Sequence, residues 1–198
     1  MRQFSPHVFG WSATDPETNI ASNAWYVQVD GETVLIDPLD PTEELLNFID
    51  VRGQPDCVIL TSAAQTRATQ SFQDLFDCPV WIHEADEHRA TLPIDRTFAD
   101  DDVLSCGLRV VQLHHQRTPG ESALYLAGLP AVMIVGSALI SAASSLEMLP
   151  AQEYENAQDA RMALSRLLEI DFDQLLCAYG RPIEREAHAI VRNFLSNA

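Results

Sequence analysis

The alternation of hydrophobic and polar positions is clearest between residues 25 and 36. Residues 25–29 alternate around Tyr26 and Gln28, and residues 33–36 resume the apolar pattern after Asp30-Gly31. An Asp-Gly pair between two such runs is a strong local signal for a two-residue turn. The pattern therefore predicts a β-hairpin.

A helix is expected directly after this hairpin. Asp40 is placed to cap its N-terminus, and Pro41 suits the first helical position. Leu45, Phe48 and Ile49 then fall on one face at helical spacing.

The rest of the chain continues this succession of strands and helices. Short apolar runs predict strands over residues 57–60, 79–82, 108–113, 123–126, 131–135 and 174–177. Helices are expected over residues 66–76, 157–168 and 187–195. Strands dominate early and β–α pairs recur, so we expect a layered α/β fold with mixed sheets. The length favours a single domain over residues 1–198.

One long uncharged segment raises the question of a membrane helix. Residues 122–146 contain no charged side chain, and about 20 apolar residues suffice to span a bilayer. Gly128, Pro130 and Gly136 interrupt the segment. Two buried strands joined by a turn are therefore expected here, and no membrane partner.

The chain is strongly acidic. It carries 12 arginines plus lysines against 29 aspartates plus glutamates, which gives a formal net charge of −17. Small soluble domains usually carry a net charge of about 2 to 8 in magnitude. A charge this negative argues against any broad surface that binds nucleic acid or an anionic membrane.

The cysteines point to a reducing compartment. Cys57, Cys78, Cys106 and Cys177 are widely spaced and form no Cys-x-x-Cys pair, a pattern typical of reduced, buried thiols. The first residues contain no apolar run of the kind that directs secretion. We therefore expect a cytoplasmic protein.

Several short motifs follow one another at the ends of the predicted strands. In chain order they are Leu35-Ile36-Asp37-Pro38, Leu60-Thr61, Thr118-Pro119-Gly120, Val135-Gly136 and Tyr179-Gly180. Their order and spacing resemble the metallo-β-lactamase superfamily from about Asn23 onward. The resemblance implies a four-layered αβ/βα sandwich with two mixed β-sheets, and a binuclear metal site at the strand ends.

The first metal-binding motif of that family is T-H-x-H-x-D-H, which falls here on residues 61–67. Ser62 and Ala64 stand at the positions of the first two histidines. Thr66 and Arg67 replace the Asp-His pair.

The remaining ligand positions differ as well. Arg117 stands where the family has a histidine before the Thr-Pro-Gly turn. Ser137 follows the strand-end glycine in place of the bridging aspartate, and Tyr179 occupies the position of the last histidine. All seven family ligands are therefore changed.

These substitutions remove the chemistry of a zinc site. A catalytic zinc needs about three nitrogen, sulfur or carboxylate donors. Alanine donates nothing, serine and threonine hydroxyls are poor neutral ligands, and a guanidinium has no acceptor and repels a dication. We therefore expect no metal, no zinc cofactor and no hydrolysis by the family mechanism.

One interpretation of the altered site is a pocket for a small anionic ligand. The resemblance places Arg67, Arg117 and Arg181 around it, and guanidinium groups bind carboxylate or phosphate well. The alternative is that these arginines form internal ion pairs with Glu121, Asp37 or Glu184. The predicted ligand-binding set is Asp37, Ser62, Ala64, Thr66, Arg67, Arg117, Ser137 and Tyr179.

A second interpretation is a rebuilt hydrolase site for an ester, thioester or lactam-like substrate. Because neighbouring strand residues point to opposite faces, only one of the adjacent His114 and His115 could enter the pocket. The rebuilt site would comprise His114 or His115 with Glu121, Asp37, Tyr179 and Arg181.

A third interpretation is a scaffold that binds a protein partner or a second copy of itself.

Residues 83–88 form a further cluster of histidines and acids. Its histidines are five positions apart, so they would not share a helical face as the paired histidines of a helical metal site do. We expect a solvated strand end followed by a helix start.

Overall fold

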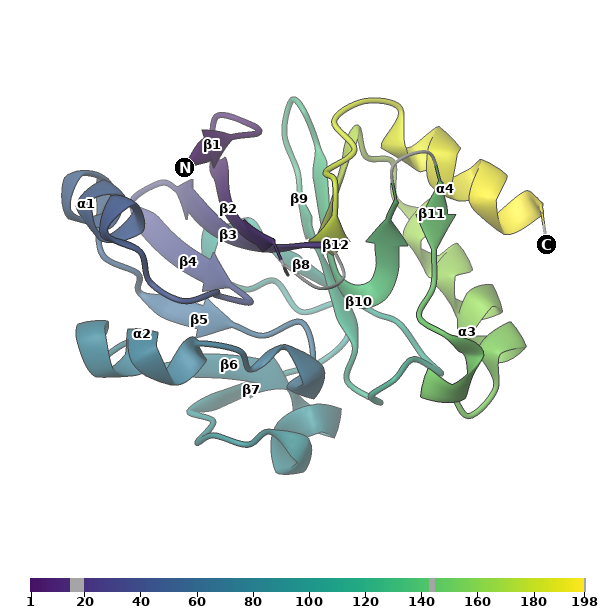
Figure 1. Ribbon diagram of the computed structural model, residues 1–198, viewed down its shortest axis with the longest axis horizontal. Helices are drawn as coiled ribbons and strands as arrows, with labels where there is room; N and C mark the ends of the chain where they lie inside the picture. Colours follow the sequence, from purple (N-terminus) through teal and green to yellow (C-terminus); the bar gives the residue numbers. More distant parts are fainter. Residues whose placement is uncertain (15–19, 143–144, 198) are drawn as a thin grey trace.

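The computed structural model describes residues 1–14, 20–142 and 145–197, and its strands form one curled mixed sheet with two halves (Figure 1). The first half holds β1 (Arg2–Gln3), β2 (Val8–Thr14), β3 (Ala21–Val29), β4 (Glu32–Ile36), β5 (Cys57–Ile59), β6 (Val80–His83) and β7 (Arg96–Phe98). The second half holds β8 (Arg109–Gln112), β9 (Ser122–Leu126), β10 (Val132–Ser141), β11 (Leu146–Glu147) and β12 (Gln174–Gly180).

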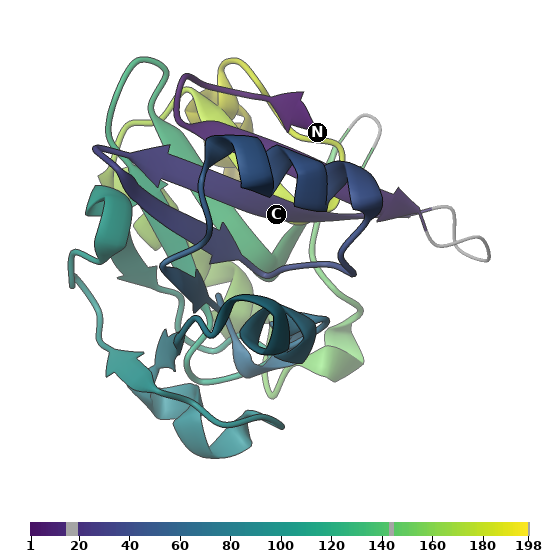
Figure 2. The same cartoon turned by 90° about the vertical axis from the view of Figure 1, so that its left-hand side faces the viewer.

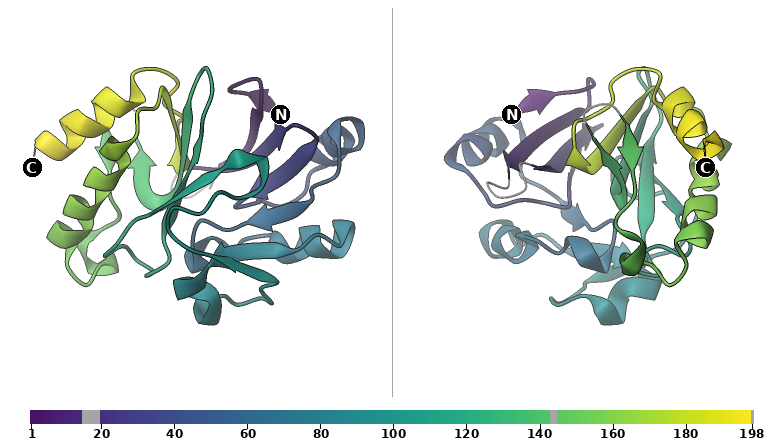
Figure 3. Two further views of the ribbon diagram at one scale, coloured as in Figure 1. Left: turned by 180° about the vertical axis from the view of Figure 1, so that it is seen from behind. Right: turned by 45° about the vertical axis from the view of Figure 1, so that its right-hand side comes forward.

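Helices cover the outer face of each half. Figure 2 shows α1 (Glu43–Arg52) and α2 (Thr69–Phe76) lying over the first half. Figure 3 shows α3 (Ala157–Ala163) and α4 (Ala187–Ser196) on the opposite side of the molecule. Short 3₁₀ turns complete the fold: η1 (Ala63–Gln65), η2 (Glu84–Arg89), η3 (Ser105–Gly107), η4 (Ala151–Glu153) and η5 (Leu164–Glu169).

The strands run in the order β7-β6-β5-β4-β3-β12-β10-β9-β8. From β4 to β7 neighbouring strands are parallel, whereas β3 is antiparallel to β2 and β4. In the second half, β10 is parallel to β12 and antiparallel to β9. The halves join where β3 meets β12 through one partner pair, Ser22 and Tyr179. The predicted four-layered fold with mixed sheets is confirmed, with its two sheets joined edge to edge.

Three apolar clusters hold these layers together. One lies between the two halves of the sheet and includes Trp25, Ile36 and Ile134. The second packs the first half against α1 and α2, and the third packs the second half against α4 and η5. Each fully buried side chain of this kind contributes roughly 1.5–3 kcal/mol.

The predicted hairpin is confirmed. Asp30 and Gly31 both have a positive φ, of 50° and 90°, between β3 and β4. This is the backbone geometry of a type I′ turn, which matches the twist of the flanking strands.

The predicted start of the following helix is wrong by two residues. Thr42, and not Asp40, caps α1, because its Oγ1 accepts a hydrogen bond from the N–H of Leu45 at 3.2 Å. Glu43 and Glu44 then fill the first turn, where acidic side chains favour the helix dipole. Pro41 therefore precedes the cap.

The uncharged segment forms strands, as expected. Its described part contains β9 and β10. Within residues 1–14, 20–142 and 145–197, no helix is long and apolar enough to cross a membrane.

Gly180, at the end of β12, lies too close to β10 for any side chain. An added Cβ would lie 1.9 Å from the carbonyl oxygen of Ser141. The Gly180 carbonyl also accepts a hydrogen bond from the amide of Asn23 at 2.9 Å. This close approach fixes the strand end beside the candidate site.

Replacing Gly180 by alanine should destabilise the protein far more than replacing Gly31. The two glycines have nearly equal φ, +88° and +90°, so the backbone strain is matched, but only Gly180 faces a collision. We expect Gly31→Ala to lower the free energy of unfolding by about 1 kcal/mol and Gly180→Ala by more than about 3 kcal/mol. Urea unfolding measures both, and equal losses would contradict the packing described here.

Candidate functional site

The loop that follows β5, residues 60–68, carries the first predicted ligand positions and lies between the two halves of the sheet. The carbonyl of Thr61 accepts a hydrogen bond from the N–H of Ser122 in β9 at 2.8 Å. The loop therefore contacts strands on both sides of the interior.

Asp37 holds the start of this loop. Its carboxyl is 1% exposed and accepts two hydrogen bonds from Thr61, from the N–H at 2.9 Å and from the hydroxyl at 2.6 Å. Asp37 follows β4 directly, with a positive φ of 47°. This carboxyl therefore ties the end of β4 to the end of β5.

Asp86 holds the next part of the loop. It accepts hydrogen bonds from the N–H of Ala63 at 2.8 Å, the hydroxyl of Thr118 at 2.6 Å and the N–H of Gly120 at 2.9 Å. The expectation that residues 83–88 are solvated is therefore wrong for Asp86, which is fully buried, and for His83, which is 3% exposed. The carboxyl is buried because three donors compensate for its lost hydration.

Glu121 lies beside the loop, on the side of the second half-sheet. It is fully buried and accepts hydrogen bonds from the N–H of Ala138 at 3.0 Å and the hydroxyl of Ser137 at 3.1 Å. The Ser62 hydroxyl lies near the same carboxyl and opposes the rise of its pKa, without the geometry of a formed hydrogen bond. An added Cβ at Gly136 would lie 2.2 Å from the Thr61 hydroxyl, so this region is densely packed.

Burial shifts two of these carboxyls toward neutrality. Desolvation raises the pKa of Asp37 to about 6, although Arg67 and the Thr61 hydroxyl oppose the rise. Desolvation likewise raises the pKa of Glu121 to about 7, opposed by Ser137 and increased by the nearby charge of Asp37. Both carboxyls therefore titrate close to physiological pH.

Arg67 uses its guanidinium on backbone carbonyls. Nη1 donates to the carbonyl oxygens of Asn23 at 2.6 Å and Asp37 at 3.1 Å, and Nη2 donates to that of Ala178 at 3.4 Å. The group also lies over the ring of Tyr179, 5.1 Å from its centroid. Arg67 thereby connects β3, the end of β4 and β12.

The other two arginines of the predicted pocket lie elsewhere. Arg117 is exposed and pairs with Glu153 at 3.2 Å, and the Arg181 side chain is also exposed. Glu184, one of the expected internal partners, pairs instead with Arg2. In the described part of the chain, the expected ion pairs of these arginines with Glu121, Asp37 or Glu184 are not formed.

The remaining predicted residues divide into buried and exposed groups. Ser62 and Ser137 are buried beside Glu121, whereas Ala64 and Thr66 are partly exposed. His114 and His115 are both exposed. Neither histidine therefore lies among the buried groups around Asp37 and Glu121.

Asn23 was not among the predicted site residues. Its amide donates to the carbonyl oxygens of Cys177 at 2.8 Å and Gly180 at 2.9 Å, and its Oδ1 accepts from the Ser12 hydroxyl at 2.7 Å. The sequence did offer a signal for Asn23: it is a polar residue in a strand whose other residues are mostly apolar. A buried amide needs hydrogen-bond partners, so such a residue is expected to bind neighbouring backbone.

The donors present do not fit the zinc site of the family. Asp37 and Asp86 direct their oxygens at backbone amides and hydroxyls, and Arg67 brings a permanent cation beside Asp37. In the residues that the structure describes, no three His, Cys, Asp or Glu side chains are grouped to hold a metal ion. We therefore derive no reaction step through a metal.

The fold and the position of this loop define a class of protein, and comparison with known sequences identifies it. A family model described as the metallo-beta-lactamase superfamily matches residues 1–197. The chain belongs to the metallo-β-lactamase superfamily. Comparison with curated proteins gives no match.

Solved structures show the same fold. The DIM-1 metallo-beta-lactamase superposes with a TM-score of 0.80 at 14% identity, covering 98% of this chain and 94% of that one. A metallo-beta-lactamase from Pontibacter korlensis gives 0.77 at 19% identity, covering 99% and 98%. The di-iron-bound form of TTHA1623 gives 0.68 at 21% identity, covering 87% and 93%.

The stability of the protein should fall as pH rises toward neutrality. Burial raises the pKa values of Asp37 and Glu121 from their ordinary 3.8 and 4.5 to about 6 and about 7. The folded protein thus holds these protons more tightly than the unfolded chain, and stability present below about pH 4 is lost progressively up to about pH 7. The loss due to Glu121 is on the order of 3 kcal/mol.

Urea unfolding at pH 5 and pH 8 measures this loss. Glu121→Gln cannot ionise, so its stability should decline less between the two pH values. Glu155→Gln, at an exposed carboxyl, is the matched control and should decline like the parent. An unchanged decline in Glu121→Gln would assign the pH dependence to other groups.

Arg67 and Arg117 should differ strongly in their effect on stability. Arg67→Met leaves three carbonyls without their donor and should lower the free energy of unfolding by about 3 kcal/mol. Arg117→Met removes a half-exposed ion pair and should cost less than about 1 kcal/mol. Urea unfolding without added anions distinguishes them. A small loss in both variants would show that the Arg67 contacts are not structural.

Proposed function

We propose that this chain is a metallo-β-lactamase-fold protein that has lost the zinc site of its family. Its role is non-hydrolytic: it binds a small anionic ligand or a protein partner. We also propose that it acts in the cytoplasm, in keeping with its four free, buried cysteines.

One observation carries this proposal: the charged groups around loop 60–68 are engaged with the protein itself, although the Ser62 hydroxyl and the Gln65 amide are buried there without a hydrogen-bond partner. Asp37, Asp86 and Glu121 accept from backbone amides and hydroxyls, and Arg67 donates to backbone carbonyls. A catalytic site needs an open coordination position or a nucleophile with its base in reach. A structural use of these groups accounts for their burial.

The existing contacts of the arginines also limit where an anionic ligand can bind. The guanidinium of Arg67 already serves three carbonyl oxygens, and Arg117 is paired at the surface. An anion would have to compete with these partners. This supports a binding role through another part of the surface.

The alternative, a rebuilt hydrolase site, requires a histidine beside a carboxyl. Exposure of His114 and His115, together with full burial of Glu121, gives that alternative less support.

Metal analysis and hydrolysis assays on one preparation test the proposal. Protein purified without chelator and dialysed against zinc should retain far less than one zinc per chain. It should hydrolyse neither a chromogenic cephalosporin nor a thioester above the buffer rate, while the DIM-1 enzyme, assayed in parallel, provides the positive control.

The possible contrary results separate the alternatives. Stoichiometric zinc would contradict the loss of the site, whether or not hydrolysis accompanies it. Hydrolysis without bound metal would favour the rebuilt site instead.

A further inference from the structure

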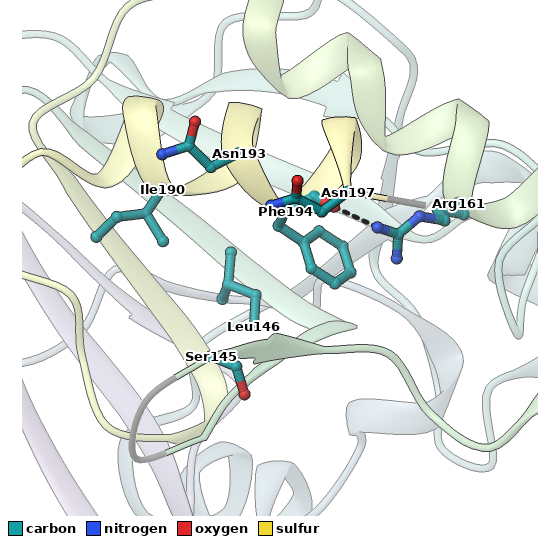
Figure 4. A pocket seen from close by; sticks show the side chains of 7 residues that line it. All are labelled: Ser145, Leu146, Arg161, Ile190, Asn193, Phe194 and Asn197. Carbon is teal, nitrogen blue, oxygen red and sulfur yellow. Dashed lines mark hydrogen bonds between the residues drawn. The ribbon is translucent and has the colours of Figure 1, made fainter.

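A pocket of about 460 Å³ opens beside α4, on the helical layer that covers the second half-sheet. Figure 4 shows Arg161 reaching it from α3, while the other side chains come from α4 and its C-cap and from the start of β11 and the residue before it. Its volume falls in the range of small-molecule sites, roughly 300–1,000 Å³. The lining residues are Ser145, Leu146, Arg161, Ile190, Asn193, Phe194 and Asn197.

The pocket has an apolar side. Leu146 is 4% exposed, and Ile190 remains 37% exposed although it is a large hydrophobic residue. Phe194 lies between them and Arg161 in the view of Figure 4. A ligand with an apolar group would cover this surface and remove it from water, which favours binding.

Arg161 gives the pocket a positive charge held in place. Its guanidinium lies 4.0 Å from the centroid of the Phe194 ring, and Nη2 donates to the Phe194 carbonyl. Stacking and this hydrogen bond orient the planar group before any ligand arrives, which lowers the entropic cost of binding.

Among the described residues, this charge has no acidic partner. No ion pair of the described residues includes Arg161, and its buried Nε has no hydrogen-bond partner. The described lining contains no carboxylate, although the whole chain has a net charge of −17. The amides of Asn193, in α4, and Asn197, at the C-cap of this helix, add neutral donors at the same pocket.

We propose that this pocket binds a small carboxylate that bears an apolar group. The carboxylate pairs with Arg161 and accepts from the asparagine amides, and the apolar group packs on Leu146 and Ile190. This inference goes beyond the proposed function, because the pocket shares no residue with loop 60–68 and its occupancy does not depend on the presence of zinc.

Benzoate is a suitable probe, with benzyl alcohol as the neutral molecule of similar shape. In a nitrogen-15 NMR titration, we expect benzoate to shift the backbone signals of residues 145–146, 161 and 190–197. Benzyl alcohol should bind at least about tenfold more weakly, since it cannot form the charged pair.

Asn193→Asp provides the test by mutation, because it places a negative charge in the pocket at an exposed position and leaves Arg161 intact. Benzoate affinity should fall at least about tenfold. Asn47→Asp makes the same charge change on α1, at the opposite side of the molecule, and should leave the affinity unchanged.

The proposal would be overturned by the absence of benzoate binding, by equal binding of benzyl alcohol, or by equal affinity in Asn193→Asp and the parent. Benzoate shifts confined to residues 60–68 would assign anion binding to the altered metal site and would also overturn it.

Discussion

Hydrogen bonds that buried carboxyls accept from the loop after β5 are the constraint on which the centre of this structure depends. Asp37, at the end of β4, accepts from Thr61, and Asp86, in η2, accepts from Ala63. Glu121, directly before β9, lies beside Ser62 and accepts from β10. Charged carboxylates are expensive to bury, and the cost is offset here by backbone donors and by partial protonation. The result is a hydrogen-bonded network that joins the ends of β4 and β5 to η2 and to the turn before β9.

Arg67 adds a group of opposite charge to this network. Where the family resemblance places a ligand histidine, the chain carries a fixed positive charge that bonds to three carbonyl oxygens. Carboxyls satisfy donors of the loop, and the guanidinium satisfies acceptors of the strands around it. Together they fill the surroundings of loop 60–68 with contacts made by the protein itself.

Much of the fold could be predicted from the sequence, because its local signals agree with the global arrangement. Asp30-Gly31 marks the hairpin, and the strand-end motifs place the layers in order. Strand β2 was not predicted: its first four residues are buried and the next three exposed, so it lacks the period-two pattern of a half-buried strand. The start of α1 was misplaced because Asp40 and Thr42 are both acceptable caps, and only the backbone geometry selects one.

The candidate site was less predictable than the fold. The changed ligand positions could be read directly, but the partners of a long side chain depend on tertiary structure. Arg67 and Arg117 occupy comparable places in the motifs, yet one is built into the interior and the other lies at the surface. Asp86 was missed because its sequence neighbours are exposed and its burial is explained by three donors distant in sequence, Ala63, Thr118 and Gly120.

The junction between the two half-sheets has a mechanical consequence. In the described part of the chain, one residue pair joins β3 to β12 through the backbone, whereas neighbouring strands elsewhere in each half share longer ladders. Asn23 and Arg67 add side-chain bonds across this line, and Asp86 bonds to Thr118 and Gly120. The resistance of the two halves to being pulled apart therefore resides in these side chains and in the apolar cluster between the halves more than in the β-ladder that joins them.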